Sequence, residues 1–262
     1  MDLKGEWKIS YYATFFVGTA GSGKSTLAGV FAEWLGDHDV DVVTVNLDPG
    51  ARYIPYTPDV DIREYIVLED VMDSFNLGPN GGLIACIDMT INFVEDLKRE
   101  LEDLAATHVL IDTPGQLELF AFRESGPIIT SALGGAQSAV CFLMDPFLVR
   151  SPSGFISVLL LGASVQYRFF LPQINVLSKA DTLTDQERQK IINWIAEPHT
   201  LLEDIEKEVE GIKREMTLNI YDALTKIHMF DVPIPTSSTR IEGLDILQAS
   251  LERIYCGGEP LT

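Results

Sequence analysis

Residues 18–25 read Gly-Thr-Ala-Gly-Ser-Gly-Lys-Ser and match the pattern G-x-x-x-x-G-K-[ST] at every fixed position. An apolar run at 11–17 precedes them, and residues 26–35 follow with apolar side chains at helical spacing. A strand, a glycine-rich loop and a helix in this order form an anion site, because backbone N–H groups and the positive end of the helix face one point. The segment therefore predicts a nucleoside triphosphate site.

Each polar residue of this phosphate loop has an expected role. Lys24 would reach the terminal phosphates, and the hydroxyl of Ser25 would be a ligand of Mg²⁺. A glycine-rich turn without a ligand is the alternative, and the match in its full context disfavours it. The residues expected to contact the nucleotide in this segment are Gly18, Gly21, Ser22, Gly23, Lys24, Ser25 and Thr26.

Strand-like and helical segments alternate along the rest of the chain. We expect the later strands at 40–47, 107–112, 138–144, 173–177 and 230–234, and helices at 90–106, 153–170, 184–196 and 243–255. This alternation predicts an α/β fold with three layers and a mostly parallel sheet, of the type found in P-loop NTPases. We expect one domain over residues 1–262, with insertions at about 52–89 and at 197–227, the latter charged and helical.

Composition narrows the classes of partner and compartment. The formal charge of −20 disfavours a generally basic surface for nucleic acid, since phosphate binding needs Lys and Arg. The three cysteines are far apart and form no C-x-x-C pair, which favours a reducing compartment and no structural zinc. The least charged stretch, at 150–168, is too short and polar to span a membrane. We therefore expect a soluble cytoplasmic protein.

A second motif, Asp112-Thr-Pro-Gly-Gln-Leu-Glu, ends the apolar strand at 107–112. Asp112 would hold Mg²⁺, and the N–H of Gly115 would contact a terminal phosphate. Gln116 would then orient an attacking water, while Glu118 would polarise that water or hold Gln116 in place. The alternative is an ordinary strand-to-helix turn with Pro and Gly, and the presence of a phosphate loop in the same chain disfavours it.

Asp48 follows the second expected strand and begins the sequence Asp-Pro-Gly-Ala. A carboxylate there would reach Mg²⁺ or the catalytic water, and the Pro-Gly turn would let the loop respond to the γ-phosphate. Taken without the neighbouring motifs, Asp48 would be read as a turn residue. The carboxyl ends of parallel strands meet at one edge of a sheet, so Asp48 is expected near the phosphate loop.

The segment Ser178-Lys-Ala-Asp181 follows the strand at 173–177 and predicts guanine recognition. The carboxylate of Asp181 would accept hydrogen bonds from N1–H and N2–H₂ of guanine, while the aliphatic part of Lys179 would cover the base. The segment resembles the N-K-x-D motif of GTPases with Ser178 in place of Asn. Ser237, in the polar loop after the last strand, would close the base pocket, although an ordinary polar turn explains that loop almost as well.

Gly78-Pro79-Asn80 lies within the first insertion. Together with the four motifs above, in the same order and spacing, it gives the chain a specific resemblance to GPN-loop GTPases, and its length is similar to that of archaeal members. The resemblance implies a homodimer in which the amide of Asn80 donates to the terminal phosphate in the partner's site. From the residues alone, Gly-Pro-Asn-Gly-Gly is a tight turn.

Three functions remain open from the sequence. The first is Mg²⁺-dependent hydrolysis of GTP to GDP and phosphate. The second is a slowly hydrolysing, chaperone-like interaction protein, and the family resemblance implies RNA polymerase subunits as candidate clients. The third is a P-loop kinase, which the lack of an evident arginine cluster disfavours. Thr19 occupies the position where MinD-like ATPases carry a second lysine, so that class is disfavoured too.

Overall fold

A sheet of seven parallel strands forms the centre of the molecule, in the spatial order β3-β2-β4-β1-β5-β6-β7. The computed structural model describes residues 11–134, 137–227 and 231–256. The strand that precedes the phosphate loop, β1, pairs with β4 on one side and β5 on the other. The strands are β1 (Tyr12–Gly18), β2 (Val42–Asn46), β3 (Val60–Asp61), β4 (His108–Asp112), β5 (Gln137–Met144), β6 (Gln173–Leu177) and β7 (Ile234–Pro235).

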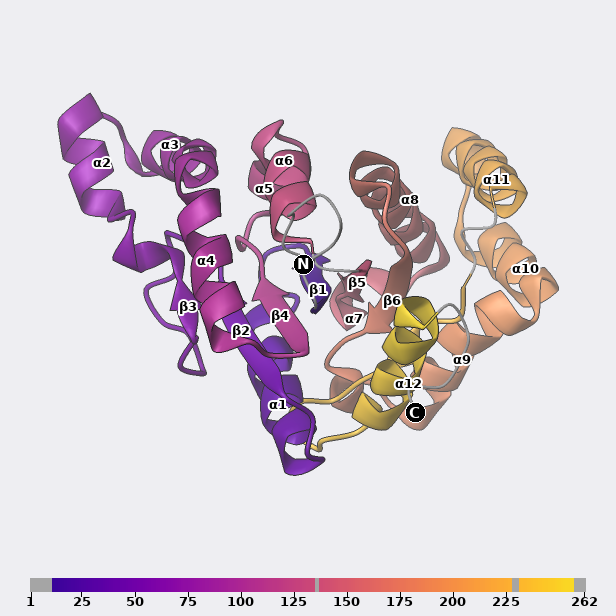
Figure 1. Ribbon diagram of the computed structural model, residues 1–262. Coiled ribbons are helices and arrows are strands. Elements are labelled where there is room, and N and C mark those ends of the chain that lie inside the picture. The colour runs from indigo at the N-terminus through magenta and orange to yellow at the C-terminus, as the bar shows by residue number, and fades with distance from the viewer. Residues whose placement is uncertain (1–10, 135–136, 228–230, 257–262) are drawn as a thin grey trace.

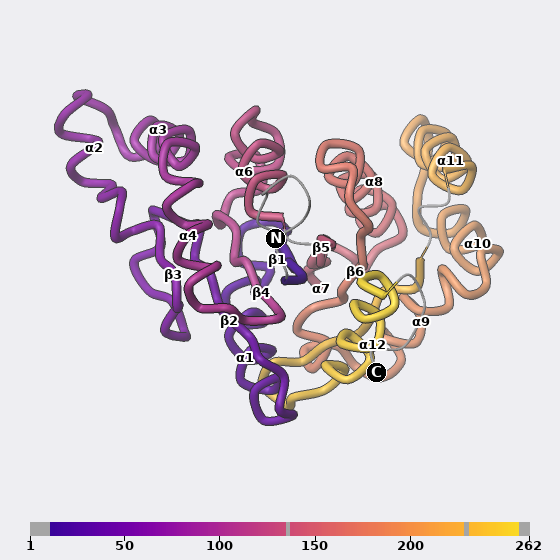
Figure 2. Tube along the Cα trace, viewed as in Figure 1, coloured from indigo at the N-terminus to yellow at the C-terminus, as the bar shows by residue number. Residues whose placement is uncertain are grey.

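Helices cover both faces of this sheet, which confirms the expected three-layer α/β fold (Figures 1 and 2). Helices α1 and α12 pack on one face, while α4, α6 and α8 pack on the other. The helices are α1 (Lys24–Asp37), α2 (Leu68–Phe75), α3 (Pro79–Met89), α4 (Val94–Leu104), α5 (Leu117–Phe120), α6 (Ser125–Leu133), α7 (Pro146–Val149), α8 (Pro152–Phe169), α9 (Asp185–Ala196), α10 (Pro198–Glu208), α11 (Gly211–Lys226) and α12 (Leu244–Tyr255), with 3₁₀ turns η1 (Ile62–Glu64), η2 (Thr90–Phe93) and η3 (Ala180–Thr182).

Side chains of one strand alternate between the two cores. In β1, Phe15 and Val17 lie in the core beneath α4, α6 and α8, whereas Phe16 lies in the core beneath α1 and α12. Successive residues of a strand point to opposite faces, so a strand covered on both sides needs apolar residues at every position. This is why the strands appear in the sequence as continuous apolar runs.

Two expected elements differ from those observed. The helix expected at 90–106 begins as the 3₁₀ turn η2 and becomes α-helical only at Val94. The strand expected at 230–234 is wrong in extent, because β7 pairs only at Ile234 and Pro235, and Phe230 lies outside the described residues. Pro233 and Pro235 have no N–H to donate to a ladder, which limits pairing at this edge of the sheet.

The first insertion contains more regular structure than its turn-rich sequence indicates. It holds β3, η1, α2 and α3. The tight turn expected at Gly78–Gly82 is wrong, because Pro79 occupies the first turn of α3 and both following glycines are helical. The chain reverses earlier, at Asn76, which caps α2 with a left-handed φ of 50°. Proline is favoured at the start of a helix, since its missing N–H has no helical partner there.

The second insertion is helical, as expected. Helices α10 and α11 occupy it and extend from the side of the sheet that α8 covers (Figure 1). Its inner side contributes buried apolar residues such as Leu201 and Ile205, whereas Ile212 and Met216 are exposed. In the part of the chain that is described, no helix combines the length and apolar character needed to cross a membrane.

Candidate functional site

The phosphate loop joins the carboxyl end of β1 to the start of α1, the geometry that its sequence predicts. Gly23 has a left-handed φ of 95° directly before the helix, a conformation that residues with a Cβ rarely adopt. Gly18 lies against β5, where an added Cβ would be 2.9 Å from the carbonyl oxygen of Leu143. Side chains at these two positions would therefore push the loop away from the sheet or distort its turn.

Lys24 is buried and its ammonium donates to three backbone carbonyls. The Nζ atom lies 2.9 Å from the oxygen of Gly18, 3.0 Å from that of Thr19 and 3.1 Å from that of Gly115. Burial lowers the pKa of this amine, and the nearby carboxylates of Asp112 and Asp48 partly counteract the effect. The three carbonyls satisfy the hydrogen-bonding capacity of this buried ammonium, so an incoming phosphate would compete with them for it.

Asp112 ends β4 and is almost completely buried beside the phosphate loop. Its Oδ2 accepts a long hydrogen bond of 3.5 Å from the hydroxyl of Tyr56, and its Oδ1 has no protein partner. Burial raises the pKa of the carboxyl to about 6, while the Ser25 hydroxyl and Lys24 act in the opposite direction. An unpartnered buried carboxylate oxygen beside a serine hydroxyl fits the oxygen ligands that Mg²⁺ prefers.

This pair of oxygen ligands is a small site by itself. Within the described ranges, no group of three or more His, Cys, Asp or Glu side chains is arranged to hold a metal ion. Mg²⁺ usually binds through one or two protein ligands together with waters and substrate phosphates, so a larger cluster is not required. The predicted ligands Ser25 and Asp112 therefore fit a magnesium ion that arrives with the nucleotide.

Asp48 joins its own loop to the motif that follows β4. Its Oδ1 accepts from the N–H of Gly50 at 2.9 Å, and its Oδ2 accepts from the N–H of Gly115, also at 2.9 Å. The amide of Gly115 is the donor expected to meet a terminal phosphate. Asp48 therefore accepts a hydrogen bond from the same amide that the sequence analysis assigns to a terminal phosphate.

The sequence analysis missed the residues that hold the Asp48 loop. The side chain of Asn46 accepts from the N–H of Asp48 at 3.0 Å and donates to Asp61 at 2.8 Å. Asp61 also binds Arg63, whose Nη1 donates to the carbonyl of Ala51 at 2.9 Å. Asn46 is a polar residue in the otherwise mostly apolar end of the run at 40–47, and this pattern could have indicated its role in holding the loop. Arg63 carried no local signal.

Gln116 and Glu118 lie where the sequence places them, directly after Gly115. Gln116 precedes α5 and Glu118 is in its first turn, and both side chains are exposed. Neither side chain packs in the core. Both therefore face solvent at the carboxyl edge of the sheet, where the terminal phosphate is expected. Their roles in positioning water stay predictions.

The predicted base pocket is a cavity of about 300 Å³ beside the phosphate loop. Asp181 accepts from the hydroxyl of Ser237 at 2.7 Å, and this hydrogen bond lowers the pKa of the carboxyl. The cavity is lined by Ser22, Gly23, Thr26, Leu27, Ser178, Lys179, Asp181, Thr182, Ser238 and Thr239. The phosphate loop, the Ser178–Asp181 segment and the loop after β7 therefore converge, as their positions after the strands predict.

Lys179 contacts both the phosphate loop and the residue that follows β5. Its ammonium donates to the carbonyl of Gly21 and to Asp145 at 2.9 Å, linking the base loop to the phosphate loop. Ser178 instead donates to the carbonyl of Met144 at 3.2 Å within the sheet. The replacement of Asn by Ser thus leaves the two loops connected through the neighbouring residue.

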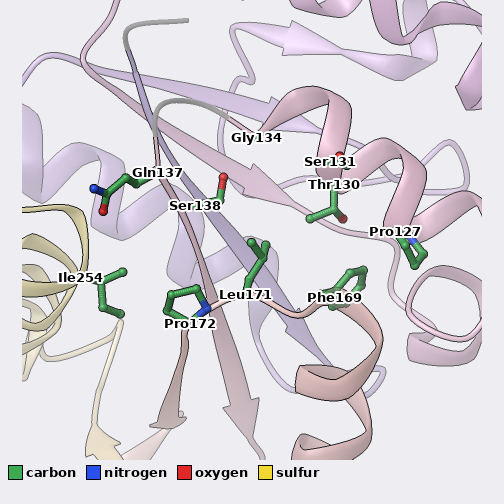
Figure 3. A pocket seen from close by; sticks show the side chains of 10 residues that line it. All are labelled: Pro127, Thr130, Ser131, Gly134, Gln137, Ser138, Phe169, Leu171, Pro172 and Ile254. Carbon is green, nitrogen blue, oxygen red and sulfur yellow. The ribbon is translucent and has the colours of Figure 1, made fainter. Parts of the chain in front are cut away.

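A separate cavity of about 440 Å³ opens at the opposite edge of the sheet (Figure 3). Thr130 of α6, Ser138 of β5, and Phe169 and Pro172 before β6 contribute to its wall. It lies at the amino ends of β5 and β6, whereas the nucleotide motifs follow carboxyl ends. None of the predicted site residues lines this cavity, so it is separate from the nucleotide site.

Comparison with known proteins decides the family. A family model described as a conserved hypothetical ATP binding protein matches residues 16–257. The GPN-loop GTPase PAB0955 of Pyrococcus abyssi is 31% identical over 256 residues, which cover 94% of this chain and 98% of that protein. The chain belongs to the GPN-loop GTPase family.

Other relatives agree with this assignment. GPN-loop GTPase 3 of Dictyostelium discoideum is 31% identical over 249 residues, covering 94% of this chain and 87% of that protein. The crystal structure of PAB0955, a GTPase in apo form, superposes with a TM-score of 0.84 at 28% identity over 95% of this chain and 99% of that one. The predicted family and GTPase activity are confirmed. The family model's description names ATP, but these relatives are named GTPases, and we follow them.

The GPN segment itself begins α3 and is exposed. Asn80 lies in the first turn of that helix, and no hydrogen bond or ion pair among the described residues joins it to the phosphate loop of its own chain. The structure therefore brings together Lys24, Asp48, Asp112 and Gly115, but not Asn80. This separation is compatible with the role across a dimer that the family resemblance implies, which stays a prediction.

Replacing Asp181 with Asn is expected to weaken GTP binding by at least about 30-fold, because hydrogen bonds from guanine to a charged acceptor are lost. Binding of xanthosine triphosphate should weaken far less, since the amide of Asn suits the altered base edge. Calorimetry with GTP, ATP and xanthosine triphosphate would measure the change, with the exposed Asp185→Asn as a control. Equal affinity of the unmodified protein for ATP and GTP would contradict guanine recognition.

Asp112→Asn should stabilise the nucleotide-free GTPase above pH 6, although it removes the predicted ligand of Mg²⁺. The folded chain binds the Asp112 proton more tightly than the unfolded chain, since the pKa is raised from 3.8 to about 6. This group therefore lowers the free energy of unfolding as pH rises through that interval. The cost is roughly 2–3 kcal/mol, at about 1.4 kcal/mol per tenfold change in proton affinity.

Thermal unfolding in EDTA, at pH 5 and pH 8, would test this expectation. The gain in Tm should be full at pH 8 and about half as large at pH 5, which lies midway between the two pKa values, and the exposed Asp103→Asn should show neither. An equal gain at both pH values would mean that the carboxylate charge is not the cause. A loss of stability at pH 8 would mean that the carboxylate is satisfied without nucleotide.

Proposed function

We propose that this protein is a Mg²⁺-dependent GTPase that acts as a homodimer and switches between GTP and GDP states to assist assembly of client proteins in the cytoplasm. The observation that carries this proposal is the hydrogen bond from the Gly115 N–H to Asp48. This hydrogen bond joins the loop of Asp48 to the loop of Gly115. The γ-phosphate of GTP would accept from the Gly115 N–H in place of Asp48, whereas GDP has no γ-phosphate and would not. All three cysteines are free, which supports a reducing compartment.

Mg²⁺ would be held by Asp112 and Ser25 together with the phosphates. When bound, the ion neutralises charge on the β- and γ-phosphates. The unpartnered Oδ1 of Asp112 supports this assignment, because such an atom is costly to bury without a partner. The ion would also balance the negative charges of Asp112 and Asp48, which both lie near Lys24.

The switch would depend on exchange of hydrogen-bond partners. GTP binding would transfer Lys24 from three carbonyls to phosphate oxygens and the Gly115 amide from Asp48 to the γ-phosphate. The Asp48 carboxylate would then be free to accept from the attacking water, beside Gln116 and Glu118. Loss of phosphate would return Gly115 to Asp48, so the position of this loop would report which nucleotide is bound.

The first insertion supports the dimer. Asn80 is exposed, and the same insertion exposes the apolar side chains of Tyr53, Val67 and Phe75. Exposed apolar side chains gathered in one segment are typical of interaction surfaces. RNA polymerase subunits are candidate clients through the family resemblance. The alternative function is a chaperone-like protein whose GTP-bound shape binds clients. In that case GTP hydrolysis would be slow and would only return the protein to its starting shape.

Molar mass and turnover measured together would test the proposal. Light scattering with GDP, and with a non-hydrolysable GTP analogue in Mg²⁺, should give twice the chain mass of 29.0 kDa at least in the second state. Chelation of Mg²⁺ should abolish GTP turnover. A chain that stays monomeric with every nucleotide while it hydrolyses GTP at its normal rate would overturn the dimeric model.

A further inference from the structure

Helix α3 contacts the loop of Asp48 and the helix α5 that follows Gln116. Asn80 is in its first turn, and Leu83, three residues later, lies over the loop of Asp48. A Cβ on Gly50 would lie only 2.2 Å from Leu83 Cδ2, so the helix packs directly on that loop. The same helix also contacts α5, which follows Gln116. The helix that presents Asn80 is therefore in contact with the expected catalytic elements of its own chain.

An ion pair joins the end of α3 to the segment after α5. The guanidinium of Arg123 binds Asp88 through two nitrogens, with Nε 2.9 Å from Oδ1 and Nη2 2.5 Å from Oδ2. The hydroxyl of Ser125 donates to the same Asp88 oxygen at 3.1 Å. A two-pronged contact between a planar guanidinium and a carboxylate fixes direction as well as distance. The pair thus orients residues 121–123 relative to α3.

The same segment is held from the opposite side by α8. Arg168 donates through Nε to the carbonyl of Ala121 at 3.1 Å and through Nη2 to that of Arg123 at 3.0 Å. Helix α8 packs on the central sheet, so it provides a fixed reference. A displacement of α3 would therefore reach α5 through Asp88, with Arg168 holding the other side.

We propose that the Asp88–Arg123 ion pair couples helix α3 to the segment that carries Gln116 and Glu118, so that docking of Asn80 on a partner subunit positions these two side chains for hydrolysis in their own chain. The proposal rests on the dimeric function above and extends it. Asp88 and Arg123 are positioning residues in this scheme, because neither touches the nucleotide. Each subunit would complete its partner's site and, through α3, align its own.

Exposure supports positioning rather than a contribution to stability. The side chains of Arg123 and Asp88 are 35% and 42% exposed. Ion pairs this accessible to water contribute little to the free energy of unfolding, since water screens them and two long side chains must be ordered. Loss of the pair should therefore leave the fold intact while it releases the orientation of α5.

A double-mutant cycle in the dimeric protein would test the coupling. Asp88→Asn and Arg123→Gln should each lower kcat for GTP by about 5- to 30-fold, while the affinity for GDP and the Tm stay close to those of the unmodified protein. The double variant should lose no more than either single variant, because both remove one interaction. The exposed Asp96–Arg99 pair of α4, with a distance of 2.9 Å, provides the control: Asp96→Asn and Arg99→Gln should leave kcat unchanged.

Hydrogen exchange adds a readout that does not depend on activity. On binding the non-hydrolysable analogue, residues 79–89 and 117–123 should become protected together in the unmodified protein, but only 79–89 in Asp88→Asn. Additive losses of kcat, or unchanged kcat in both single variants, would overturn the coupling. Asn80→Ala, measured alongside, separates the two proposals: if it remains fully active, the shared dimer site itself fails.

Discussion

Mixing Asn80→Ala chains with Lys24→Ala chains is expected to restore GTP hydrolysis that neither variant has alone. If Asn80 acts in the partner's site, a mixed dimer contains one site with both residues intact and one site with both removed. Random exchange would make about half of the dimers mixed, with one working site in each, so about a quarter of the normal activity should return. Without sharing, every site would keep one defect and no activity would return.

The physical basis of this expectation is local. Lys24 is buried beneath the phosphate site of its own chain, whereas Asn80 is exposed at the start of α3. An amide N–H₂ donates to phosphate oxygens without adding a charge, so it suits a contact formed only after docking. Pro79 restricts the backbone before Asn80 and lowers the entropy lost when the segment is ordered.

Steady-state phosphate release from the mixture, with subunit exchange followed by fluorescence transfer between labelled chains, would measure the effect. The exposed Asn219→Ala of α11 is a matched control and should be fully active by itself. Confirmed exchange without recovered activity would refute the shared site.

Gln116→Ala and Glu118→Ala should each reduce GTP hydrolysis by about 10²–10³-fold while nucleotide affinity is retained. Both side chains are exposed, next to the Gly115 amide that is expected to bind the γ-phosphate. We expect these side chains to position and polarise water and not to bind phosphates. Their removal should therefore lower the rate of the chemical step and leave nucleotide affinity unchanged. Single-turnover hydrolysis, with affinity for the non-hydrolysable analogue measured separately, would distinguish the two steps.

Glu206→Ala, an exposed glutamate on α10, is the control and should be without effect. If both test variants hydrolysed GTP normally, another group would have to position the water. Asp48 would be the first candidate, because its Oδ2 already lies 2.9 Å from the Gly115 nitrogen.

Elements whose residues are close together in the chain could be predicted from the sequence alone. The phosphate loop, the strand before it and the helix after it are consecutive, so the pattern specifies the local backbone and its chemistry. The runs at 107–112 and 173–177 likewise predicted β4 and β6, because a strand buried on both faces must be apolar throughout. Placement of Asp48, Asp112 and Asp181 at one edge followed from parallel strands.

The conformation around Pro79 could be predicted only in part from the sequence. Gly78-Pro79-Asn80 reads equally well as a turn or as a helix start, and contacts outside the segment decided between them. Buried Gly82 packs against Leu68 and Met72 of α2, which favours a continuous helix from Pro79 onward. No pattern within five residues contains that information.

The contacts between side chains far apart in the chain could be identified only from the folded structure. Arg63 reaches Ala51, Arg123 reaches Asp88 and Arg168 reaches Ala121, and each of these contacts joins different segments of the chain. Lys179, not Ser178, proved to connect the base loop to the phosphate loop. Such contacts depend on the direction and distance of side chains after the layers have packed. A periodic pattern reports which face of an element is buried, but it carries no information about the partner that a polar side chain will find.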